Sequence, residues 1–284
     1  MKVLDHRKHV LADKPFALNV QDAQKIVEKA KLELTPNGKL AFLDFETRLT
    51  PGVQRMRSVI RSKKIGDARV LSFRGLMNGG FAADNAKFTH WSARESGGGI
   101  FSAVGTHLVD TCRYILADEV ECVSAIEDPL VQYQTNAETG SAQRVTAGFY
   151  VSVQMKMKKG THVTMVLSAR SPGLPAENMV VVMCDSGTMT FDYMTSEYKL
   201  YNSKGKKDGP EELLCNYGSA FSDVGTPLLF DAIRSRILYG ENEPDPDMKS
   251  LAKEIATFED GLEVQKVTDA VHLSSEKDGE WIQV

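Results

Sequence analysis

The chain has 284 residues, of which 42% are hydrophobic and 25% are charged, the proportions of an ordinary globular protein with one or two domains. It carries 34 Lys and Arg against 38 Asp and Glu, and a net charge of −4 argues against broad electrostatic binding to nucleic acid or an anionic membrane. No apolar stretch approaches the roughly 20 residues that span a bilayer, and the charged N-terminus lacks the apolar segment of a signal peptide. The four cysteines are widely spaced without a CxxC pair, which indicates neither a metal site nor a disulfide framework. We therefore expect a cytoplasmic protein with no nucleic-acid or membrane partner.

The first part of the chain predicts a strand, a helix and a second strand. A short apolar run at residues 9–12 ends before Pro15, which indicates a buried strand that enters a loop. Residues 20–31 place apolar side chains at helical spacing, and residues 40–45 form a second apolar strand. This order predicts a βαβ unit with a right-handed connection.

The next part predicts a helix, a strand, a long loop and a second helix. A helix begins near Pro51, and residues 68–75 alternate as a half-buried strand does. Residues 76–99 form a loop rich in Gly, Asn and Ser, and long loops in compact domains are disproportionately functional. The helix at 100–117 carries His107 on an otherwise apolar face.

From residue 121 onwards the pattern is β-rich, and the chain closes with helices. Because no helix separates the expected strands, they should pair mostly antiparallel; they lie at 146–157, 161–169, 179–184, 188–191 and 198–201. A polar loop at 202–212 precedes two helices, at 227–239 and 248–274. The fold class is therefore α+β: a βαβ unit, then a large, mostly antiparallel open sheet covered by helices.

Several segments resemble the Gfo/Idh/MocA oxidoreductases, which include glucose–fructose oxidoreductase and inositol dehydrogenase. The run HVLADKP at 9–15 is similar to the family signature HVLCEKP. Further matches follow in the family's order: Arg48-x-x-Pro51, the glycines at 97–99 with the segment that follows them, and residues 257–281. The resemblance implies NAD or NADP as cofactor, a sugar, polyol or related alcohol as substrate, and a homodimer formed through the antiparallel sheet.

The resemblance also implies site residues. Lys14 and His107 match catalytic positions, and Asp13, Lys14 and Pro15 match positions beside the cofactor. Lys14 follows the carboxyl end of a strand, where open α/β sheets bind ligands; the alternative is a solvated loop lysine. A histidine exchanges protons near neutral pH; the alternative for His107 is a core histidine bonded to a backbone carbonyl.

The expected substrate-binding residues are Arg48, Trp91, Thr106 and Asp110. Arg48 would bind an acidic or phosphorylated group, or it is a solvated arginine near a turn. Trp91 would stack on a sugar ring, or it packs its loop onto the protein. Asp110 lies one helical turn beyond His107 and would orient it, or it is an ordinary polar helix residue.

Two departures from the family pattern bear on function. The sequence has no GxGxxG loop for the cofactor pyrophosphate, and it has Ala103 where family enzymes carry Asp. By resemblance, roughly the first 80 to 90 residues of a dinucleotide-binding domain are missing. Residues 1–50 would then be the remnant of a Rossmann domain, and residues 51–284 a substrate and dimerisation domain that includes the returning helices.

Three functions stay open on these observations. The first is an NAD(P)-dependent oxidoreductase with impaired cofactor binding, because most of the expected cofactor site is missing. The second is a non-catalytic scaffold or carbohydrate-binding homologue. The third is a truncated form of a complete dehydrogenase.

Overall fold

The structure is a computed structural model that describes residues 2–77, 80–83, 85–202 and 220–284. The polar loop expected at 202–212 lies, apart from its first residue, outside the described residues. Within the described parts of the chain, no helix is both long enough and apolar enough to cross a membrane.

The expected βαβ unit is present near the N-terminus. Strands β1 (Val10–Ala12) and β2 (Ala41–Leu43) pair in parallel, and helix α1 (Val20–Glu33) connects them. The side-chain oxygen of Asn19 accepts the backbone N–H of Asp22 at 2.8 Å and so begins α1. The carboxyl ends of both strands therefore meet at one edge, which is where a parallel pair presents a ligand site.

A large sheet forms the centre of the molecule, with strand order β12-β11-β10-β3-β9-β8-β5-β13. Its strands are β3 (Ala68–Leu76), β5 (Val120–Asp128), β8 (Tyr150–Met157), β9 (His162–Ser168), β10 (Glu177–Cys184), β11 (Gly187–Asp192), β12 (Glu197–Asn202) and β13 (Ile282–Gln283). All neighbours pair antiparallel except β3 and β9, which are parallel. The expectation of a mostly antiparallel sheet is confirmed, and a separate small sheet holds β4 (Lys87–Phe88), β6 (Tyr133–Asn136) and β7 (Ala142–Arg144).

Three helices, α2 (Pro51–Arg61), α3 (Thr106–Leu116) and α6 (Phe258–Glu276), pack against the large sheet. Their apolar side chains join those of the inner sheet face in one core, which includes Met56, Leu108, Val153, Phe191 and Val267. The helix expected at 100–117 starts with a π-helical turn, Phe101–Gly105, and continues as α3.

The prediction of a single helix at 248–274 is wrong, because two helices occupy this region. Helix α5 (Pro246–Ala252) ends, the chain extends, and α6 begins at a cap formed by Thr257 and Asp260. In the extended stretch the carbonyl of Ala256 accepts the N–H of Leu43 at 2.9 Å. Pairing with β2 therefore interrupts the helix between α5 and α6.

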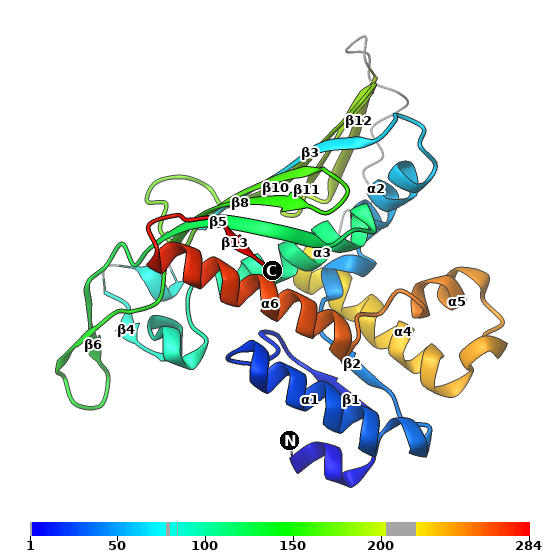
Figure 1. Cartoon of the computed structure of the whole chain (residues 1–284), viewed down its shortest axis with the longest axis horizontal. Helices are drawn as coiled ribbons and strands as arrows, with labels where there is room; N and C mark the ends of the chain where they lie inside the picture. The colour runs from blue at the N-terminus through cyan, green and yellow to red at the C-terminus, as the bar shows by residue number, and fades with distance from the viewer. Residues whose placement is uncertain (1, 78–79, 84, 203–219) are drawn as a thin grey trace.

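The returning helices join the N-terminal unit to the sheet. In Figure 1, α6 lies between α1 and the large sheet, with α4 (Thr226–Leu238) and α5 to one side. Phe258 of α6 is buried with residues of α1, including Val27 and Ala30. Phe42 and Leu49 are buried against α4 and α5. Apolar side chains from residues 1–50 therefore pack against α4, α5 and α6, across the domain boundary expected at residue 50.

Candidate active site

A pocket of about 530 Å³ opens where the carboxyl ends of β1 and β2 face α3 and β10. Asp13 and Lys14 line it from the loop after β1, Asp44 and Glu46 from the segment after β2, and His107 from α3. Glu177, Asn178 and apolar side chains complete the wall. Of the residues predicted for the site, Asp13, Lys14 and His107 therefore share one pocket.

Lys14 is held with its ammonium in this pocket. Its Nζ donates to the carbonyl oxygen of Ala103 at 2.5 Å, and the peptide bond that joins it to Pro15 is cis. Burial lowers the pKa of Lys14, while the carboxyl groups of Glu46, Asp13 and Asp44 oppose that shift. Residue 103 thus contributes a backbone acceptor, although its side chain offers no carboxylate.

Asp44 and Glu46 form a carboxyl pair that sequence reasoning missed. Burial raises the pKa of Asp44, and burial together with the neighbouring Asp44 charge raises the pKa of Glu46 to about 8. Ionising two carboxyl groups that lie close together in a partly buried site costs free energy, because the two negative charges repel each other. The pair therefore holds a proton at neutral pH, and its place after β2 was the available clue, since Lys14 occupies the equivalent place after β1.

His107 is buried, with only 5% of its surface exposed. Burial and, second, the charge of Lys14 hold the pKa of His107 well below its usual range, so the imidazole is neutral. Its Nδ1 lies 3.4 Å from Oε2 of Glu46, and the edge of its ring meets the ring of Phe45 with centroids 5.8 Å apart. A neutral imidazole can accept a proton at one nitrogen and donate at the other.

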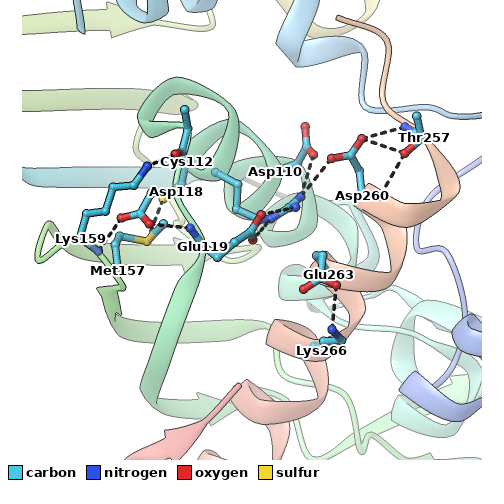
Figure 2. Close-up of polar contacts among 12 residues, drawn as sticks. Asp110, Cys112, Asp118, Glu119, Met157, Lys159, Thr257, Asp260, Glu263 and Lys266 are labelled. Atoms are coloured by element: carbon cyan, nitrogen blue, oxygen red, sulfur yellow. Dashed lines mark hydrogen bonds and ion pairs between the residues drawn. The ribbon is translucent and has the colours of Figure 1, made fainter. Parts of the chain in front are cut away.

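Arg48 and Asp110, both predicted to bind substrate, lie outside the pocket and bind each other. Nε and Nη2 of Arg48 each donate to a carboxylate oxygen of Asp110 at 2.6 Å, and Nη2 also lies 2.7 Å from Oδ1 of Asp260. In Figure 2, Asp110 and Asp260 approach one another from α3 and α6, and Asp260 also reaches Thr257. The three residues form an ion-pair network, buried at Arg48 and Asp110, that ties η3 (Glu46–Leu49) to both helices.

Trp91 and Thr106 also lie outside the residues that line the pocket. Trp91 is half-buried in a short 3-10 turn, with its ring centroid 4.8 Å from that of His90. The hydroxyl of Thr106 donates to the carbonyl of Ser102 at 3.0 Å, inside the helix. In this structure both side chains pack the protein itself.

The residues present fit the reacting end of a nicotinamide cofactor. The pocket offers an ammonium and an imidazole beside the carboxyl end of a parallel strand, and these groups can bind a substrate oxygen and exchange its proton. At the glycines of 97–99 the backbone packs closely: a Cβ on Gly98 would meet the carbonyl oxygens of His90 and Trp91 at 2.5 Å. Glycine allows this packing because it has no Cβ.

Comparison with known proteins relates part of the chain to a known domain family. Residues 53–190 match the family model of the GFO/IDH/MocA C-terminal domain. Residues 53–190 are therefore a Gfo/Idh/MocA C-terminal domain. Glucose-fructose oxidoreductase domain-containing protein 2 of Xenopus tropicalis is 29% identical over 303 aligned positions, which cover all of this chain and 73% of that protein.

Two solved structures illustrate the likeness of the fold. An NAD binding oxidoreductase from Klebsiella pneumoniae aligns with a TM-score of 0.80 and 18% identity, over 99% of this chain and 75% of that chain. Levoglucosan dehydrogenase in complex with NADH and L-sorbose aligns with a TM-score of 0.77 and 18% identity, over the same shares. At these identities the likeness establishes the fold.

Proposed function

We propose that this chain is an NAD(P)-dependent oxidoreductase that acts on a hydroxyl group of a sugar, polyol or related alcohol. One observation carries the proposal: Lys14 and His107, distant in sequence, line one pocket at the carboxyl end of β1. Levoglucosan dehydrogenase, a structural neighbour that was solved in complex with NADH and L-sorbose, supports the cofactor and the substrate class. We further propose that residues 1–50 face the cofactor and residues 51–284 supply the substrate and dimerisation surfaces.

The chemistry follows from the charge states of the two side chains. When bound, a nicotinamide cofactor supplies the acceptor for the hydride that leaves the substrate carbon. Asp13, Lys14 and Pro15 would lie along its reacting end. The ammonium of Lys14 stabilises negative charge on the substrate oxygen, and the neutral imidazole of His107 exchanges the hydroxyl proton.

Loss of the Lys14 ammonium tests this proposal directly. Lys14→Met should lower kcat at least about 100-fold, since a positioned proton-transfer or charge-stabilising group contributes at least that much. The measurement is absorbance of reduced nicotinamide across a panel of neutral polyols, together with calorimetric titration of NAD(H) and NADP(H). Circular dichroism checks that the variant folds.

Lys266→Met is the matched control, because Lys266 lies on α6 outside the pocket, its side chain is 38% exposed, and it pairs with Glu263. It should leave turnover unchanged. Equal turnover in Lys14→Met and the unaltered chain would contradict the mechanism. Absence of both cofactor binding and turnover in the unaltered chain would contradict the activity and favour a non-catalytic scaffold.

We also propose that the chain forms a homodimer through the open face of the large sheet. On this face Ser72 lies between Thr164 of β9 and Val181 of β10 in register, and all three side chains are accessible. Val70, opposite Met183, adds apolar surface to the same face. Light scattering at micromolar concentration should show a dimer, and a monomer would contradict this arrangement.

A further inference from the structure

The contact between Glu46 and His107 is shielded from solvent on both sides. The two side chains are only 10% and 6% exposed, with Oε2 of Glu46 3.4 Å from Nδ1 of His107. Glu46 opens η3 directly after β2, whereas His107 belongs to α3, so the contact joins two separate elements. The contact brings a carboxyl oxygen to within 3.4 Å of a ring nitrogen of His107.

Side-chain hydrogen bonds join η3 to α3 immediately after Glu46. The hydroxyls of Thr47 and Thr111 lie 3.2 Å apart, and Arg48 binds Asp110 through two hydrogen bonds. Both partners on α3 lie on the helix that carries His107. These contacts hold Glu46 at a constant position relative to the imidazole, as a positioning residue requires.

The charged groups around Glu46 come from each wall of the pocket. Asp13 and Lys14 follow β1, Asp44 follows β2, His107 lies in α3 and Glu177 in β10. The neighbouring segment η8 (Ala220–Gly225) carries Asp223, which is exposed. Lys14 is thus the single cation among the described residues that line the pocket, facing several carboxyl groups and a neutral imidazole.

We propose that Glu46 is the positioning residue of His107, and that Glu46 with Asp44 holds the proton that His107 exchanges with the substrate hydroxyl. The inference rests on the proposed function. In oxidation of the alcohol, a bound nicotinamide cofactor would accept the hydride from the substrate carbon, and the hydroxyl proton would pass to His107. His107 gives a proton from Nδ1 to the ionised carboxylate of Glu46 and is neutral again. Reduction runs the same transfers in reverse.

This arrangement has a definite pH dependence. Glu46 can accept a proton only when it is ionised, and its pKa is raised to about 8 by burial and by the Asp44 charge. Oxidation of the alcohol should therefore accelerate as the pH rises through about 8, and carbonyl reduction should slow over the same interval.

Nuclear magnetic resonance of the full chain with ¹⁵N-labelled histidine tests the contact without needing turnover. His107→Gln identifies the His107 signals by their loss. We expect the His107 ¹⁵N shifts to change with an inflection near pH 8 as Glu46 ionises. The inflection should disappear in Glu46→Gln and move in Glu46→Asp, which withdraws the carboxyl group by one methylene.

Glu177→Gln is the matched control, since Glu177 lies on the same pocket but faces Arg74, with Oε2 3.5 Å from Nε. It should keep the inflection. His272, whose Nδ1 lies 2.8 Å from Glu127, provides a second histidine–glutamate contact remote from Glu46, and its signals should not respond to Glu46→Gln.

An unchanged inflection in Glu46→Gln would overturn the proposal. So would the absence of any His107 inflection near pH 8 in the unaltered chain, which decides the matter even where a variant does not fold. If turnover depends on Lys14 but the inflection is absent, the role of Glu46 is refuted and the proposed function stands. If the inflection is present but the chain binds no cofactor, the dehydrogenase function is refuted and the contact between Glu46 and His107 stands.

In an active preparation, the kinetic readout is the split between kcat and KM. Glu46→Gln should lower kcat and abolish its pH inflection, with little change in KM, because Glu46 acts through His107 and not on the substrate. A change confined to KM would contradict the assignment.

Discussion

Replacement of Asp110 by Asn tests whether the ion-pair network holds η3 in place. Asp110 has no exposed surface and accepts two hydrogen bonds of 2.6 Å from Arg48. Burial alone would lower the pKa of Arg48, but the charges of Asp110 and Asp260 raise it, so the guanidinium stays charged. The substitution keeps the shape of the side chain and removes the charge that faces this buried cation.

The expected cost is about 3 kcal/mol. Breaking a buried ion pair by removing one partner costs about 3–5 kcal/mol, because the remaining charge is left without compensation. The lower end applies because Asp260 still lies 2.7 Å from Nη2 of Arg48. At roughly 2 °C per kcal/mol for a chain of this size, Tm should fall by about 6 °C.

Urea and thermal unfolding, followed by circular dichroism, measure the effect. Glu263→Gln is the control, since the Glu263 and Lys266 side chains are 35% and 38% exposed and their pair appears beside the network in Figure 2. It should cost less than about 0.5 kcal/mol. A loss below about 1 kcal/mol for Asp110→Asn would refute the reasoning, because the cation would then be compensated without Asp110.

Two further predictions concern the start of α6 and the carboxyl pair. Thr257→Ala removes the cap in which Thr257 accepts the N–H of Asp260, and should lower the free energy of unfolding by about 1 kcal/mol in urea titration; no loss would contradict the cap. The raised pKa of Glu46 means that the folded chain keeps a proton that the unfolded chain releases between pH 4.5 and about 8. The free energy of unfolding should therefore fall as pH rises through that interval, and Glu46→Gln should flatten the slope; an identical slope in the variant would contradict the shift.

Local sequence pattern was sufficient for much of the fold. Apolar spacing of 3.6 or 2 residues shows which face of an element is buried. That is why α1, α2 and the strands from β8 to β12 appear close to their expected places. The same local logic located Lys14, because a side chain that follows a strand of a βαβ unit must lie at the carboxyl edge of the sheet.

The apolar spacing of residues 248–274 predicted one helix and did not indicate the break between α5 and α6. The apolar spacing continues across the break, yet Ala256 bonds to Leu43 far away in the sequence. A T-x-x-D cap at Thr257 and Asp260 was the available clue. The insertion of β3 between β9 and β10 is likewise a matter of long-range pairing.

The sequence by itself determined the family pattern, the α+β class and three of the pocket residues, Asp13, Lys14 and His107. Only the tertiary structure decided that Arg48 and Asp110 bind each other outside the pocket, and that Glu46 lies against His107. The physical reason is that a charged side chain takes its protonation state and its partner from the groups that surround it in space. Those groups come from segments that no local periodicity relates.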